Sequence, residues 1–139
     1  MFKRKCLSFC FVVDIDFAFA FAIAFAFDFA IASYVFEHST NPELFLKEIQ
    51  RVAKRGFIEV PDAFRERITC VPYHRLEISN IDNVLHITKK TGPINDIGIN
   101  ELLDDYKRDL INDFTAKHPF EFQIRYYWDK DNGGIKYKI

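Results

Sequence analysis

Glu37 and His38 are adjacent ionisable side chains that could do acid–base chemistry. A carboxylate beside an imidazole can move a proton to or from a reacting group near neutral pH. The same two residue types also cap or pack the loop that leads into a helix. The pair therefore has a catalytic interpretation and a purely structural one. Which of them applies depends on where the surrounding strands and helix place the two side chains.

The other histidines and the three cysteines show no metal-ligand spacing. Cys6 and Cys10 are four residues apart, but Val13 stands where an iron–sulfur triplet would need its third cysteine. The remaining histidines have no ligand spacing to one another or to a cysteine; they are His74, His86 and His118. From the sequence we predict no metal site. The sparse, odd cysteine count suits a reducing compartment, so we expect a cytoplasmic location.

Composition excludes several further classes. A length of 139 residues allows one domain, and a hydrophobic fraction of 49% is enough for a core. The formal net charge of −1 offers no basic groove. We therefore expect no nucleic-acid partner, and the aromatic residues 126–128 are predicted to pack rather than to stack on bases. The chain also contains no Walker loop, no G-x-S-x-G and no H-E-x-x-H motif.

A predicted βαβ unit positions the Glu37–His38 pair. Residues 27–33 read FDFAIAS, which indicates a buried strand. The helix after it begins at Asn41-Pro42, because asparagine caps helix N-termini and proline suits the first helical position.

The second half of the unit follows directly. Apolar residues recur at helical spacing from residue 45 to residue 53, and Gly56 is predicted to cap the helix C-terminus. Residues 57–60 form a short second strand that Pro61 ends. Two strands joined by a helix of this length are expected to be parallel, with a right-handed crossover.

The rest of the chain changes character. Residues 75–78 and 84–89 indicate strands on either side of a turn-rich segment. Residues 100–114 place apolar side chains on one helical face. Residues 120–128 alternate apolar and polar side chains, and the sequence DNGG follows them. We therefore expect the chain to end in a hairpin that residues 135–139 complete.

Residues 1–26 are an anomalous apolar, low-complexity segment, and residues 27–139 are the α/β region. Residues 17–32 read FAFAFAIAFAFDFAIA, and this strict alternation indicates a strand with a bulky face. The run would extend about 53 Å as one strand, and a membrane-spanning helix would need about 20 apolar residues. Membrane association is an alternative that the interrupting Asp28 disfavours. Self-association through the bulky face is expected, because the run has the profile of an aggregation-prone strand.

Residues 27–62 resemble part of a known enzyme family. They read FDFAIASYVFEHSTNPELFLKEIQRVAKRGFIEVPD. This sequence resembles the fourth strand, the following helix and the fifth strand of a class I S-adenosylmethionine-dependent methyltransferase of the type 11 kind. The resemblance covers about a quarter of the chain, and residues 75–89 would correspond to the family's final antiparallel strands. It implies an α/β fold: a partial Rossmann-like sheet, made of the βαβ unit and an antiparallel hairpin, with helices packed on it.

The resemblance also implies a site. Ligands of open α/β sheets bind beyond the carboxyl ends of the strands, where Ser33, Tyr34, Glu37 and His38 fall. By resemblance, Ser33, Tyr34 and Glu37 bind the cofactor S-adenosylmethionine near its reacting end. His38 is then the catalytic base or an orienting group. Asp16 would be the acid that faces the adenine.

The family's glycine-rich cofactor loop has no counterpart in this sequence. Glycine is needed there because backbone must approach the ligand closely, yet the first of the five glycines is Gly56. We therefore expect a methyltransferase-like protein that is truncated and impaired in cofactor binding, with an unknown methyl acceptor. The alternative is a non-enzymatic fragment that acts by association with a protein or a membrane through residues 17–32.

Overall fold

The predicted βαβ unit lies at the centre of the fold. The computed structural model describes residues 6–10, 27–69, 71–91, 106, 112–113, 115–118 and 120–139. Strand β2 (Phe27–Ser33) leads through helix α1 (Pro42–Val52) into strand β3 (Ala53–Pro61), and the two strands are parallel. The helix begins as predicted, because the Asn41 side chain accepts the backbone N–H of Leu44 at 3.1 Å.

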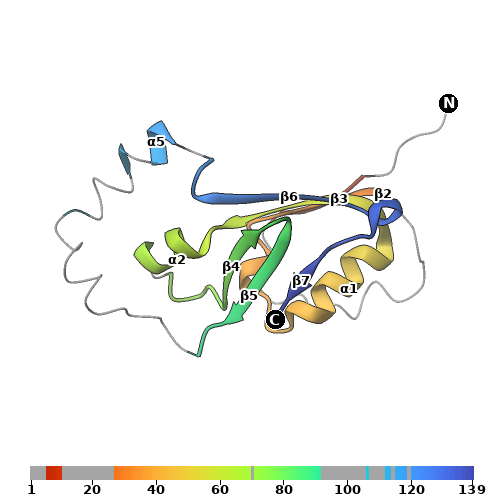
Figure 1. The fold of residues 1–139 in the computed structure, drawn as a ribbon, viewed down its shortest axis with the longest axis horizontal. Coiled ribbons are helices and arrows are strands. Elements are labelled where there is room, and N and C mark those ends of the chain that lie inside the picture. Colours follow the sequence, from red (N-terminus) through yellow and green to blue (C-terminus); the bar gives the residue numbers. More distant parts are fainter. Residues whose placement is uncertain are drawn as a thin grey trace.

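Two further strands extend this sheet. Its order is β1-β2-β3-β6 in the part of the chain that the structure describes. Strand β1 (Cys6–Cys10) is parallel to β2, and strand β6 (Gln123–Asp129) is antiparallel to β3. Figure 1 shows β2, β3 and β6 side by side, with α1 on one side of them. The predicted fold class is confirmed: the chain is α/β with a partial Rossmann-like sheet.

A second, smaller sheet contains the predicted hairpin. Strand β4 (Leu76–Ile81) pairs antiparallel with β5 (Val84–Lys89), and β7 (Tyr137–Lys138) runs parallel to β5. The turn residues Asp82 and Asn83 both have positive φ, at 52° and 60°, as a two-residue hairpin loop of type I′ requires. The hairpin was expected as the last strands of the main sheet. That expectation is wrong, because β6 takes the antiparallel edge next to β3.

The predicted C-terminal hairpin does not form. A 3₁₀ turn at Lys130–Asn132 follows β6 as the DNGG sequence indicated, but β6 pairs with β3 and β7 pairs with β5. Two side chains direct the last residues into the second sheet. Gln50 Oε1 accepts the Ile135 N–H at 2.8 Å, and the Tyr126 hydroxyl accepts the Lys136 N–H at 2.9 Å.

Gly56 does not cap α1, which is a second correction. The helix ends at Val52, and Ala53 is already extended. Gly56 lies inside β3, where a Cβ atom would stand 2.5 Å from the Ala30 carbonyl oxygen and 2.7 Å from the Trp128 ring. The glycine is therefore needed for the close approach of Trp128 to the strand.

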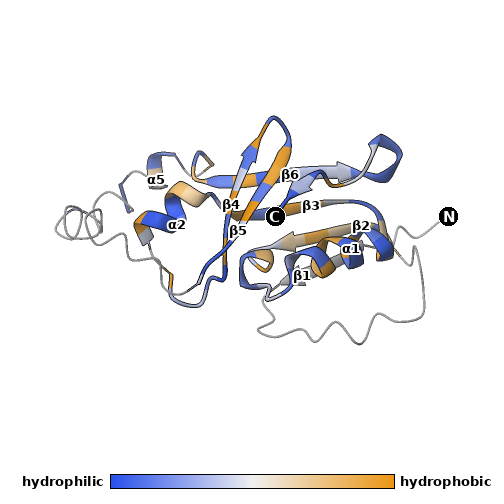
Figure 2. Cartoon of the chain, turned by 60° about the horizontal axis from the view of Figure 1, so that its bottom comes forward, coloured by the Kyte–Doolittle hydropathy of each residue, from blue (hydrophilic) through white to orange (hydrophobic). Residues whose placement is uncertain are grey.

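The core lies between one face of the main sheet, α1 and the β4–β5 hairpin. Ala30 and Ala32 are fully buried, whereas Phe29 and Ile31 are half-buried on the opposite face. The small side chains of β2 therefore face the core. Helix α1 contributes Phe45, Leu46 and Ile49, and the hairpin contributes Leu76, Ile78, Leu85 and Ile87. Figure 2 shows hydrophobic and hydrophilic residues on different parts of α1, as expected for a helix that covers a sheet.

Several predictions concern residues outside the described part of the chain. They are the strand at residues 12–16 with Asp16, the Phe–Ala run up to residue 26, and most of the helix at 100–114. The first described strand is β1, which lies earlier, at Cys6–Cys10. The end of the Phe–Ala run, residues 27–32, is strand β2 and not helix. Among the residues described, no helix is both long and apolar enough to cross a membrane.

Candidate functional site

A pocket of about 250 Å³ lies at the carboxyl ends of β2 and β3. Tyr34 follows β2 directly, and Glu37 and His38 lie in the 3₁₀ turn η2 (Phe36–His38) that leads toward α1. The other lining residues come from the end of β3, from α2 (Ala63–Thr69) and from the loop before β4; they are Pro61, Arg65, Thr69, Val71, Tyr73 and His74. Open α/β sheets bind ligands at this edge.

Tyr34 turns the chain sharply after β2. Its φ is +53°, and its backbone N–H donates to the Glu59 carbonyl oxygen at 2.8 Å. Its hydroxyl is hydrogen-bonded to the Gln123 side-chain amide at the start of β6. These contacts hold the phenol ring at the rim of the pocket and direct the next residues back over the sheet edge.

Glu37 is the most unusual side chain of the site. It is only 2% exposed, and neither carboxylate oxygen has a hydrogen-bond partner. Burial raises the pKa of Glu37 from its ordinary 4.5 to about 7. The backbone is well anchored, because the Glu37 carbonyl oxygen accepts the Arg75 N–H at 2.8 Å. The fold therefore fixes the backbone of Glu37 in place, while its carboxylate oxygens remain without a hydrogen-bond partner.

His38 lies at the mouth of the same pocket. Its ring stacks on Tyr73, with centroids 5.6 Å apart, and its Nδ1 faces the Tyr73 carbonyl oxygen at 3.4 Å. A carbonyl oxygen can only accept, so Nδ1 carries the proton and Nε2 keeps its lone pair. Nε2 is 4.0 Å from Glu37 Oε1. Burial lowers the pKa of His38 below its ordinary value, which favours the neutral ring that a general base needs.

The fold brings a third ionisable group to the pair. His74 precedes β4, and its ring centroid is 4.8 Å from that of His38. The His74 Nδ1 is 2.5 Å from Oε2 of the buried Glu66, and the Lys90 Nζ donates to the other Glu66 oxygen at 2.5 Å. Burial alone would raise the pKa of Glu66, but the hydrogen bonds from His74 and Lys90 lower it overall.

The sequence predicted the first part of this site and missed the second. Tyr34, Glu37 and His38 line one pocket together. Ser33 does not line it, because its hydroxyl donates to Glu59 Oε2 at 2.9 Å instead. Asp16 lies outside the described residues. The assignments of these five residues to cofactor or catalysis stay predictions. His74 and Glu66 come from different elements, so no spacing in the sequence indicated them.

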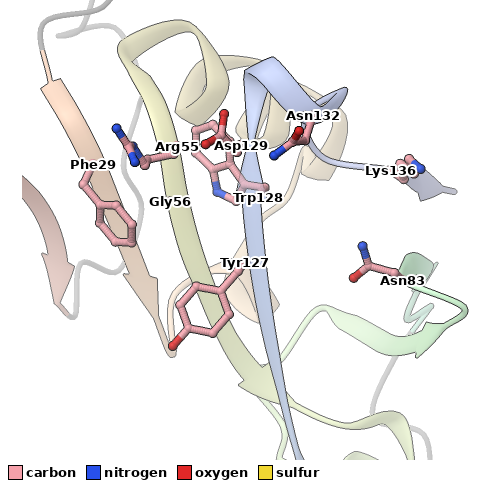
Figure 3. Close-up of a pocket in the computed structure, with 10 residues that line it drawn as sticks. Phe29, Arg55, Gly56, Asn83, Tyr127, Trp128, Asp129, Asn132 and Lys136 are labelled. Atoms are coloured by element: carbon pink, nitrogen blue, oxygen red, sulfur yellow. The ribbon is translucent and has the colours of Figure 1, made fainter.

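A second pocket of about 410 Å³ lies at the opposite edge of the sheet, near the amino ends of β2 and β3. Figure 3 shows Phe29 and Arg55 on one side of it and Asn83 and Lys136 on the other. It is larger, but α/β sheets rarely bind ligands at this edge. We therefore take the pocket that Glu37 and His38 line, called the carboxyl-edge pocket below, as the candidate functional site.

Comparison with known proteins identifies one related family. A family model described as a methyltransferase domain matches residues 8–58. The matched stretch begins within β1, ends within β3 and includes the Glu37–His38 turn. It supports a class I S-adenosylmethionine-dependent methyltransferase-like domain, as the resemblance predicted, and this part of the chain is methyltransferase-like. No curated protein and no solved structure matches the chain.

Proposed function

We propose that the protein takes part in S-adenosylmethionine-dependent methyl transfer at the carboxyl-edge pocket. We also propose that this chain, by itself, binds the methyl donor weakly. One observation carries the proposal: three residues of the matched stretch, Tyr34, Glu37 and His38, converge on a single pocket at the ligand-binding edge of the sheet.

The side chains in the pocket suit the acceptor side of the reaction. S-adenosylmethionine supplies a methyl group bound to a positively charged sulfur. The acceptor atom would form its bond to that carbon as the carbon–sulfur bond breaks and the neutral thioether leaves, and an acceptor that carries a proton would give the proton up to a base. His38 Nε2 carries the lone pair that would take this proton. Tyr34 at the rim would position the acceptor or the donor, because its hydroxyl is held by Gln123. Arg65, also in the lining, would favour an acceptor that carries negative charge.

Two observations support weak binding of the donor. No glycine precedes Gly56, so the sequence has no glycine-rich loop ahead of the matched strands. The pocket that the described residues form holds about 250 Å³, below the roughly 300–1,000 Å³ of sites that enclose a whole ligand. A pocket of this size suits the reacting end of the donor together with a small acceptor group.

Titration calorimetry of the purified chain with S-adenosylmethionine tests the affinity. We expect a dissociation constant weaker than roughly 100 µM, which corresponds to about −5.5 kcal/mol. A low-micromolar constant, about −8 kcal/mol, would overturn the claim of weak binding.

Nuclear magnetic resonance at millimolar donor tests the location. The backbone amides of residues 33–38 should shift in a saturable way, whereas the amide of Ser79 in the hairpin should not. Saturable shifts confined to the second pocket, for example at Asn132 and Lys136, would place the ligand at the wrong edge of the sheet and overturn the proposal.

A further inference from the structure

Glu37 is a buried carboxyl group whose two oxygens have no hydrogen-bond partner. Its side chain is 2% exposed and lines the carboxyl-edge pocket, yet neither oxygen accepts a hydrogen bond. Leaving a buried charged acceptor unpartnered costs at least as much as a lost hydrogen bond. Buried carboxylates are normally paired with a cation or coordinate a metal. The nearest candidate cation is His38, whose Nε2 is 4.0 Å away, beyond hydrogen-bond distance.

Both neighbouring histidines are held as metal ligands are held. His74 Nδ1 faces Glu66 Oε2 at 2.5 Å, and His38 Nδ1 faces the carbonyl oxygen of Tyr73. A ligating histidine almost always donates its second ring N–H to a carboxylate or a backbone carbonyl, which orients the ring and fixes the tautomer. In both residues this arrangement leaves Nε2 as the available ligand atom.

The three side chains come together closely enough to share one ion. One ligand atom each from Glu37, His38 and His74 lies within 4.8 Å of the other two. Ligands about 2.0–2.2 Å from a zinc ion are roughly 3.3–3.6 Å from one another in a tetrahedron. A side-chain adjustment of about 1 Å would close the site. The His38 side chain is 24% exposed, so it has space for such a shift.

We propose that Glu37, His38 and His74 bind a divalent transition-metal ion, with Zn²⁺ as the best fit. Two imidazoles and one carboxylate form the ligand set of many catalytic zinc sites, and they leave a coordination position open for water or substrate. That position would face the carboxyl-edge pocket, which all three residues line. A hard ion such as Mg²⁺ fits less well, because it prefers an all-oxygen shell.

The charged groups around the cluster are compatible with an ion. Glu66 provides a second carboxylate behind His74, and Lys90 neutralises the Glu66 oxygen that points away. Arg65 is the one guanidinium in the described lining of the pocket, and it would select an anionic group on the open side of the metal. This inference does not depend on methyl transfer, since the site would bind the metal alone. An ion on His38 Nε2 would occupy the lone pair that would otherwise take the acceptor's proton, so the base role proposed for His38 applies to the chain without the ion.

Titration of the full chain with Zn²⁺ alone tests the proposal. We expect one ion per chain, and we expect Glu37→Gln and His38→Ala each to weaken binding by at least about tenfold. Glu66→Gln, which keeps the shape of the group behind His74 but removes the charge that also pairs with Lys90, should weaken it by roughly 10- to 100-fold. The matched control is His118→Ala, which removes an exposed histidine that is also paired with a glutamate, Glu121, and it should leave the affinity unchanged.

Substitution with Co²⁺ separates this site from the cysteines. Nitrogen and oxygen ligands give weak visible bands, whereas thiolate ligation by Cys6, Cys10 or Cys70 would add an intense near-ultraviolet band. Circular dichroism of each variant checks that it is folded, and folded Glu37→Gln and His38→Ala chains suffice for the comparison. The proposal is overturned by the absence of Zn²⁺ binding, by equal affinity of these two variants and the original chain, or by a thiolate spectrum.

Discussion

Glu37 shows how the burial of a single carboxyl group can cost stability. Burial raises its pKa to about 7, although its own backbone N–H, His74 and Arg65 favour the charged form and only Glu66 adds to the effect of burial. In the unfolded chain the same carboxyl group loses its proton near its ordinary value of 4.5. Between these two pH values the folded protein therefore holds a proton that the unfolded chain has released, so stability falls as the pH rises.

The first prediction follows from this linkage. In a buffer with chelator, Glu37→Gln should leave the free energy of unfolding nearly unchanged at pH 4.5 and should raise it at pH 8. The gain is at most roughly 3 kcal/mol, since each pKa unit is worth about 1.4 kcal/mol. Urea denaturation at both pH values measures it. The exposed Glu43, which pairs with Lys47 on the surface of α1, supplies the control Glu43→Gln. A gain that is equal at both pH values would contradict the assigned cause.

At Gly56 the surrounding atoms leave no space for a side chain. The atoms that a Cβ would meet are the Ala30 carbonyl oxygen at 2.5 Å and the Trp128 ring at 2.7 Å. The first of these is backbone in the middle of the sheet and cannot move without shifting β2.

The second prediction is that Gly56→Ala destabilises the protein strongly. Overpacking in a well-packed core costs about 1–3 kcal/mol, and the backbone contact places Gly56 at the upper end of this range. Gly133→Ala is the comparison, because that site has open space but a φ of +91°, which costs about 1–2 kcal/mol. Urea midpoints of the two variants are the measurement. A Gly56→Ala variant as stable as the original chain would show that β2 and β3 are less closely packed than the structure has them.

At the scale of elements, the bounds of helices and strands were predicted correctly where several local sequence preferences agreed. The bounds of β2 and the start of α1 were predicted because alternation, the Asn41 cap and Pro42 all pointed to the same assignment. The end of α1 was predicted wrongly, because a glycine such as Gly56 after Lys-Arg is typical of a helix C-terminus. Gly56 instead leaves room for the ring of Trp128, a residue far away in the sequence. No local pattern contains that information.

The third prediction concerns the helix cap. Asn41→Ala removes the acceptor for the Leu44 N–H and should lower the free energy of unfolding by about 1 kcal/mol. Thr40→Ala next to it is the control, because Thr40 is exposed and the N-cap of α1 is Asn41. Urea denaturation compares the two variants. An equal effect of both would mean that the Asn41 hydrogen bond does not stabilise α1.

The candidate site, like the helices and strands, could be predicted from the sequence only in part. Tyr34, Glu37 and His38 are close in sequence and follow one strand, so the sheet-edge rule placed them together. His74 reaches them only because the loop before β4 folds back over η2, where the Arg75 N–H meets the Glu37 carbonyl oxygen. That contact depends on how the second sheet packs, which the sequence did not specify.

At the scale of the whole molecule, Tyr126 joins the two sheets. It lies on β6 of the main sheet and is buried, with 1% of its surface exposed. Its hydroxyl donates to the Asn83 carbonyl oxygen in the hairpin turn at 3.3 Å and accepts the Lys136 N–H before β7 at 2.9 Å. Lys136 in turn accepts the Leu85 N–H at 2.9 Å. One phenol therefore holds the ends of the second sheet against the first.

The last prediction is that Tyr126→Phe loosens the second sheet while leaving the first intact. The phenyl ring fills the same volume, so only the two hydrogen bonds are lost, at a cost of about 1–2 kcal/mol. Native-state hydrogen exchange should quicken at the Leu85 and Lys136 amides and stay unchanged in β2 and β3. Tyr127→Phe is the control, because that side chain lies on the other face of β6 and is 68% exposed. If exchange quickened equally in both sheets, the two sheets would unfold as one unit, and Tyr126 would support the whole core instead of joining two separable parts.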